Sequence, residues 1–159
     1  MRWIAYVVII FLALAPILAG IAGHAIGSGV LHPMRLHPQR LEQTALTLAS
    51  ARATKENFSV RTSDGVELHG WKIHAPAPSG DWVLLFHGVS DNRTGTLGHA
   101  EFLLRHSYSV VMLDSRAHGA SGGDMATYGW KERYDPVAVA GALKYLQKRR
   151  LRSVGSPHD

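Results

Sequence analysis

A serine lies at the centre of a Gly-x-Ser-x-Gly pattern, residues 119–123, which is the spacing that presents a nucleophilic serine for acyl transfer. Such a nucleophile needs a strand running directly into the pattern and a helix leaving it, because the tight turn between them raises the serine above the sheet. Residues 114–118 separate this pattern from the preceding apolar run, and residues 124–128 do not begin a helix. We therefore do not expect Ser121 to act as a nucleophile.

The other side chains capable of chemistry follow two apolar runs, residues 82–86 and 108–113. These side chains, with their flanking glycines, are His87, Gly88, Asp114, Arg116, His118 and Gly119. Apolar runs of this length are typical of strands buried in a mostly parallel sheet. The residues that follow the two runs can therefore converge at one end of that sheet.

Asp91 adds a further carboxylate near these strand ends, so a metal site is one interpretation of the cluster. However, no histidine pair has the i, i+4 spacing of helical zinc ligands, and the H-E-x-x-H pattern does not occur. His69 and His74 are five positions apart in a predicted strand, so they point to opposite faces. We expect no metal ion here.

A scaffold of strands and helices must position the cluster. Residues 58–62 and 66–73 alternate between apolar and polar side chains on either side of Asp64-Gly65, which predicts a β-hairpin. Residues 97–104 carry apolar side chains at helical spacing between the two apolar runs. The resulting strand, helix, strand unit predicts an α/β fold with a right-handed crossover.

A further helix is expected from residue 135 onward. Asp135 would be its N-cap and Pro136 its first residue, and the apolar side chains from Val139 to Leu146 line one face. A third buried strand is expected to follow such a helix, and residues 1–159 do not supply it.

The amino-terminal segment from Trp3 to Gly23 has no charged side chain, is dominated by apolar residues, and has about the ~20 residues needed to cross a bilayer. A cleavable signal peptide is the alternative, with small-residue sites at residues 20–22 and 23–25. We favour an uncleaved single-pass anchor, because a signal peptide has a shorter apolar stretch of ~7–15 residues. The basic residues that flank the segment do not fix its orientation, and we favour the extracytoplasmic side for the domain.

Composition narrows the function classes. The chain has no cysteine, which excludes disulfides, thiolate metal sites and a cysteine nucleophile. Its net charge of +5 permits attraction to anionic lipids or nucleic acid. The basic residues are scattered, and the one dense run, residues 148–150, fits the last turn of a helix. We therefore expect a lipid bilayer, contacted by residues 3–23, and no nucleic acid among the partners.

The order of these elements resembles the N-terminal half of an α/β-hydrolase over roughly residues 57–150. The resemblance depends on the apolar strand entering His87-Gly88 and on the D-x-R-x-H-G-x-S-x-G loop of residues 114–123. This loop, with residues 127–129 and 132–135, is similar to that of the lipase-like and serine-aminopeptidase-like branch. Ala117 departs from the pattern, because a glycine is more usual at that position.

The resemblance implies roles for several residues. In this family a backbone N–H just after the His-Gly pair, here that of Val89, contributes to an oxyanion hole. The Asp, Arg and His of the loop, here Asp114, Arg116 and His118, have a structural role beside the active site. The family's serine, acid and histidine triad follows later in the chain, and no cofactor takes part.

Two functions remain open at this point. The first is a serine hydrolase of ester or amide bonds, of which residues 1–159 would be an N-terminal fragment that is inactive alone. The second is a non-catalytic, membrane-tethered module that binds a partner through an open sheet edge. In both, residues 1–23 are the anchor or signal segment, residues 24–56 a connector with a bridging helix over residues 39–55, and residues 57–159 a partial α/β-hydrolase domain.

Overall fold

A computed structural model describes residues 2–154 of the chain, with side chains as far as residue 146. The chain divides into two compact units, Met1–His32 and Pro33–Asp159. The first unit consists of helix α1, Arg2–Leu31. This helix is long and apolar enough to cross a membrane, and a signal sequence can have the same properties.

Helix α1 is longer than the expected apolar segment, because it continues through residues 24–31, which were expected to form part of a connector. No charge interrupts these residues, and Gly27 and Gly29 each cost a helix only about 1 kcal/mol relative to alanine. After Pro16, which lies inside α1, the next residue that hinders a helix is Pro33, two residues beyond the end of α1.

The second unit contains a four-stranded sheet in the order β1-β2-β4-β3. The strands are β1 (Thr54–Arg61), β2 (Glu67–His74), β3 (Trp82–Phe86) and β4 (Ser109–Leu113). The pairs β1–β2 and β2–β4 are antiparallel, whereas β3 and β4 are parallel. This mixed sheet confirms the predicted α/β class, with a hairpin followed by parallel strands.

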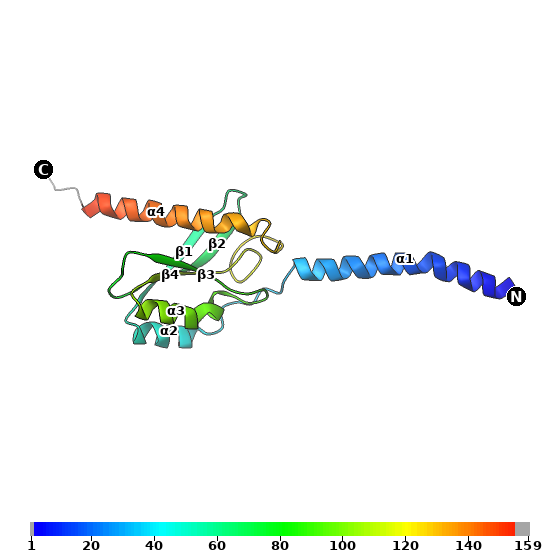
Figure 1. Ribbon diagram of the computed structural model, residues 1–159, viewed down its shortest axis with the longest axis horizontal. Coiled ribbons are helices and arrows are strands. Elements are labelled where there is room, and N and C mark those ends of the chain that lie inside the picture. The colour runs from blue at the N-terminus through cyan, green and yellow to red at the C-terminus, as the bar shows by residue number, and fades with distance from the viewer. Residues whose placement is uncertain (1, 155–159) are drawn as a thin grey trace. The chain divides into compact units, whose positions relative to one another are not determined.

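Helices cover both faces of the sheet, as Figure 1 shows with α4 on one side and α2 and α3 on the other. Helices α2 (Leu41–Ser50) and α3 (Leu97–Arg105) contribute Leu48, Ala100 and Leu104 to one apolar core. Helix α4 (Asp135–Val154) contributes Val139 to the other core, with side chains from β1, β2 and β4. Burial of these apolar side chains stabilises the layered arrangement.

The prediction that both parallel strands are buried on both faces was correct for β4 and wrong for β3. All five side chains of β4 are buried, because β4 lies between β2 and β3. Those of β3 are only partly covered, and Phe86 is exposed. Among the described strands β3 has one neighbour, so it forms an edge of the sheet.

The bridging helix is shorter than predicted, and the sheet begins earlier. Helix α2 ends at Ser50, and Arg52 follows in the left-handed region with φ +52°. Strand β1 then starts at Thr54, so residues 54–56 pair with β2 and do not belong to the connector. The Glu56 carboxylate accepts hydrogen bonds from Lys72 at 3.0 Å and from His74 at 2.7 Å, which favours this longer pairing.

Asp135 begins α4 but is not its N-cap, contrary to the sequence prediction. A short 3-10 helix, Glu132–Tyr134, precedes it, and Asp135 itself has helical backbone angles of φ −63° and ψ −45°. Its carboxylate accepts hydrogen bonds from Arg116 instead of from the first turn of the helix. The side chains of the basic run, residues 148–150, lie outside the described residues.

Candidate functional site

The turn after β3, residues 87–90, is hydrogen-bonded to the loop after β4. The backbone N–H of Ser115 donates to Nε2 of His87 at 3.0 Å, so Nε2 carries no proton. Nδ1 of His87 donates to the carbonyl of Gly88 at 2.7 Å. Burial, together with the nearby His118, lowers the pKa of His87, although the Gly88 carbonyl opposes this shift. The imidazole of His87 is therefore held neutral as a link between the two segments.

His118 makes a second link in the opposite direction. Its Nε2 accepts the backbone N–H of Ser90 at 3.2 Å, and its Nδ1 donates to the carbonyl of Arg116 at 2.9 Å. The rings of His118 and His87 meet edge to face with centroids 5.0 Å apart. Both histidines thus use both ring nitrogens to hold the turn against the loop, and neither has a nitrogen available as a general base.

Val89 is an exposed residue of the turn that follows β3. It is 55% exposed as a residue, and no hydrogen bond to its backbone N–H is found among the described residues. The next residue, Ser90, has φ +57°, a strained angle for a residue other than glycine. The bond from Ser90 to His118 stabilises that angle, so the Val89 N–H is fixed in direction and free to donate.

Asp114 is the buried centre of the loop after β4. One carboxylate oxygen accepts the backbone N–H of Arg93 at 2.7 Å, and the other accepts the Arg93 guanidinium at 2.7 Å and the Ala120 N–H at 2.8 Å. Burial alone would raise the pKa of Asp114, but these three donors lower it below its ordinary value. The sequence analysis did not identify Arg93, because the residues around it are of the same types as those around an exposed arginine.

Arg116 connects the loop to two distant elements. Its guanidinium donates to both carboxylate oxygens of Asp135 at 3.1 and 2.5 Å, and to Asp64 in the hairpin turn at 2.8 Å. Hydrogen bonds from Arg116 and then Thr62 hold the pKa of Asp64 well below its usual range. Sequence reasoning placed Arg116 in the loop but identified neither aspartate as its partner.

Ser121, the serine of the Gly-x-Ser-x-Gly pattern, is fully buried. Its Oγ donates to the carbonyl of Asp114 at 2.6 Å and accepts the backbone N–H of His69 at 2.8 Å. A hydroxyl in this position joins the loop to β2 and has no open path to a substrate. The burial and hydrogen bonds of Ser121 therefore indicate a structural role for this side chain.

Two positions in the loop have left-handed backbone angles. At Gly119, with φ +48°, an added Cβ would lie 2.1 Å from a carboxylate oxygen of Asp114, so any side chain there would displace the carboxylate. Ala117 has φ +61° and is buried, which explains why glycine is the more usual residue at this position. An alanine in this region costs about 1 kcal/mol.

A hydrogen-bonded loop follows, and Glu132 is at its centre. The carboxylate accepts the N–H and hydroxyl of Thr127 at 2.7 and 2.6 Å, and the N–H of Gly129 at 2.8 Å. Burial would raise the pKa of Glu132, but these donors lower it. The loop is thereby ordered although it lacks regular secondary structure.

Residues 33–38, the part of the predicted connector at the start of the second unit, also contact the site. The Arg35 guanidinium donates to the carbonyls of Ser121 and Gly123. The Asn92 side-chain amide donates to the carbonyl of His37 at 3.4 Å. Connector residues 33–38 are therefore fixed to both loops, a feature that the sequence did not indicate.

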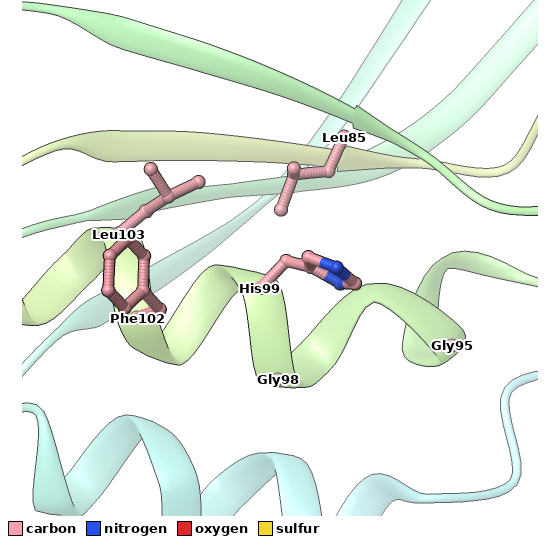
Figure 2. A pocket seen from close by; sticks show the side chains of 6 residues that line it. All are labelled: Leu85, Gly95, Gly98, His99, Phe102 and Leu103. Carbon is pink, nitrogen blue, oxygen red and sulfur yellow. The ribbon is translucent and has the colours of Figure 1, made fainter.

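An open groove of about 480 Å³ lies between β3 and α3. Figure 2 shows Leu85 pointing from the strand toward the helix, with His99, Phe102 and Leu103 along the helical side. The groove is lined by Leu85, Gly95, Gly98, His99, Phe102 and Leu103. None of the sequence-predicted site residues lines it, so it is separate from the polar cluster.

Known proteins share this arrangement over part of the chain. No protein-family model matches it. The uncharacterized protein YqkD of Bacillus subtilis (strain 168) is 30% identical over 96 residues, which are 60% of this chain and 31% of YqkD. The chain thus spans about a third of the length of this relative.

Solved structures give a fuller match. The esterase Pf2001 of Pyrococcus furiosus is 30% identical with a TM-score of 0.60, and the match covers 72% of this chain and 42% of the esterase. A second crystal form of the same esterase gives 31% identity and a TM-score of 0.61. The resemblance inferred from the sequence is thereby confirmed: over the part of its length that aligns with these structures, the chain has an α/β-hydrolase-like fold.

Proposed function

We propose that this chain contributes the oxyanion-stabilising turn of a hydrolase that cleaves ester or amide bonds by acyl transfer. The observation that carries the proposal is the Val89 N–H, which has no hydrogen-bond partner among the described residues and sits on a turn tied to the next loop by two histidines. Similarity to the Pyrococcus furiosus esterase supports esters as the first substrates to test.

In the proposed mechanism the described residues stabilise the negative charge that develops on the substrate and do not supply the nucleophile. As a nucleophile adds to the substrate carbonyl, negative charge develops on the oxygen, and a donor already aimed at that oxygen lowers the barrier. The bonds of His87 and His118 to backbone groups fix the Val89 N–H before substrate arrives. In this proposal the nucleophile is a serine of a Ser/His/acid triad that none of these side chains supplies.

A chimera tests the proposal directly. The segment of the Pyrococcus furiosus esterase that aligns with this chain would be replaced by the matching segment of this chain, and hydrolysis of p-nitrophenyl butyrate measured. Val89→Pro removes the N–H, whereas Val89→Ala keeps it. Loss of one oxyanion donor lowers kcat by about 10²–10³-fold, so we expect that loss for Val89→Pro and nearly full activity for Val89→Ala.

The outcome is interpretable only for folded chimeras, which cooperative unfolding by circular dichroism would establish. A folded Val89→Pro chimera that hydrolyses the ester as fast as the Val89→Ala chimera would refute the role of this N–H.

One observation supports the second function, a partner-binding module. Strand β3 has an unpaired edge among the described strands, and the groove beside it exposes Phe102. A strand of another protein could pair with such an edge. A folded chimera with no hydrolysis at all, even before Val89 is changed, would favour this second function over the first.

A further inference from the structure

The loop that ends at α4 exposes an unusual set of side chains to solvent. Met125, Tyr128 and Trp130 are 36%, 55% and 67% exposed. The cations Lys131 and Arg133 follow directly in the chain, and the Arg133 guanidinium lies 4.2 Å from the centroid of the Trp130 ring. Exposed aromatic rings next to lysine and arginine are characteristic of surfaces at the membrane–water interface.

This exposure is not a result of local disorder. Glu132 holds the loop closed through Thr127 and Gly129, so the rings are presented by a fixed backbone. Glu132 keeps its negative charge, because its hydrogen-bond donors are neutral and lower its pKa, but its side chain is only partly exposed. The exposed charged side chains of the loop are one acid, Asp124, and two cations, Lys131 and Arg133. These exposed cations are suited to an anionic surface.

The loop lies at the same end of the sheet as the polar cluster. It begins after Gly123, whose carbonyl accepts from Arg35, and it ends at Asp135, which is bonded to Arg116. Figure 1 shows this segment, yellow to orange, beyond the end of the strands and leading into α4. Both of its ends are thus fixed beside the loop after β4.

The connector reaches this same end of the domain. Arg35 is bonded to the carbonyls of Ser121 and Gly123, and three residues separate it from Leu31, the last residue of α1. The four extended steps from Leu31 to Arg35 span at most about 14 Å. If residues 2–31 enter a bilayer, the chain leaves it close to the loop and not at the far end of the sheet.

We propose that connector residues 33–38 and loop residues 124–134 together form a second membrane contact, a rim that lies against the headgroup layer. Met34, which is 72% exposed, and the three side chains Met125, Tyr128 and Trp130 would enter the interface. Lys131 and Arg133 would meet lipid phosphates. This contact is distinct from the spanning helix, and it does not depend on the proposed hydrolase activity.

Single-cysteine labelling of the full chain tests the rim cleanly, because the natural sequence has no cysteine. Met125→Cys and Trp130→Cys place an environment-sensitive fluorophore on the rim. Ala77→Cys is the matched control, because it is an exposed residue in the loop at the other end of β3. Each variant is reconstituted into phosphatidylcholine vesicles with a minor share of phosphatidylglycerol and of lipid carrying a headgroup nitroxide.

We expect the nitroxide to quench both rim labels at least about twofold more than the Ala77→Cys label, since the aromatic belt lies at headgroup level. Arg133→Glu should reduce quenching at Met125→Cys, and Lys144→Glu, an exposed cation on α4, should not. Equal quenching at all three positions, or none at the rim, would overturn the proposal. A full chain that does not float with the vesicles would overturn it too, because the connector would then be tethered to nothing.

Discussion

Ser121 lies in a Gly-x-Ser-x-Gly pattern typical of nucleophiles, yet its hydroxyl is hydrogen-bonded to backbone groups. Its hydroxyl donates to the buried carbonyl of Asp114 and accepts the partly buried N–H of His69. Both groups would lose their partner if the hydroxyl were removed, and a buried group without a partner costs about 1–3 kcal/mol.

Ser121→Ala should therefore lower the free energy of unfolding by about 1–3 kcal/mol without changing any hydrolysis. Urea unfolding of the full chain in detergent would measure the first effect, with the exposed Ser59→Ala as a control expected within about 0.5 kcal/mol. The unaltered full chain should not hydrolyse p-nitrophenyl acetate. Turnover that disappears in Ser121→Ala would show that the serine is a nucleophile after all.

At this scale the sequence predicted the members of the loop better than their partners. Asp114, Arg116 and His118 do come together, because the order of strands and the turn residues are local signals. Arg93, and the role of the turn residue Asp64 as a partner of Arg116, were missed, since each bonds to a residue more than 20 positions away. The sequence raised Ala117 as a departure from the usual glycine, and its backbone angle of φ +61° supplies the reason.

At the scale of elements, Arg116 joins parts of the fold that share no strand pairing. Asp64 in the hairpin turn and Asp135 in the first turn of α4 both accept hydrogen bonds from this one guanidinium. The hydrogen bonds that Arg116 donates to Asp135 and Asp64 raise the pKa of Arg116, despite its burial, so it stays charged under all ordinary conditions. The ion pair with Asp135 is buried on both sides, whereas Asp64 is partly exposed.

Arg116→Ala should cost about 3–5 kcal/mol, because it leaves the buried carboxylate of Asp135 without its charge partner. Urea unfolding would measure this loss, and hydrogen exchange should increase at residues 135–139 first. Arg105→Ala is the matched control, because Arg105 forms an exposed i, i+4 pair with Glu101, and we expect it to cost under about 1 kcal/mol. Equal effects of the two substitutions would contradict the role assigned to Arg116.

The elements themselves were largely predictable, and their limits were not. Residues 82–86 and 97–104 appear as predicted, because apolar spacing reports which face is buried. The exposed edge of β3 could not be predicted, since an apolar run reads the same in the centre of a sheet and at its border. Likewise the helical angles of Asp135 follow from a tertiary bond to Arg116, which overrides its preference for the N-cap position.

At the scale of the whole molecule, stability should depend on pH in two separate windows. The pKa of His87 is lowered in the folded state, so its contribution is present above the ordinary value of 6.5 and is lost as pH falls below it. The pKa values of Asp114 and Glu132 are also lowered, from ordinary values of 3.8 and 4.5, so their contributions persist until the pH falls below those values.

Urea unfolding at a series of pH values should therefore show a first loss of stability between about pH 7 and pH 5 and a second below about pH 4. His87→Gln should reduce the first loss and leave the second unchanged. An identical pH profile for the variant and the original chain would mean that His87 is not held neutral by the fold.

The strand order has a consequence for how the protein is assembled during synthesis. The β1–β2 hairpin forms between strands that are close in sequence. Strand β2 also pairs with β4, so Gly70 can pair with Leu113 only after 43 further residues have been synthesised. Strand β3 leaves the ribosome before β4 and still has no place in the sheet, since it pairs only with β4 among the described strands. For that interval both the hairpin and the apolar β3 carry unpaired edges, which makes them attractive to other strands. Strand β4, the last of the described strands to be synthesised, is the one that joins them, so a pause in translation between residues 86 and 109 would prolong the stage most exposed to aggregation.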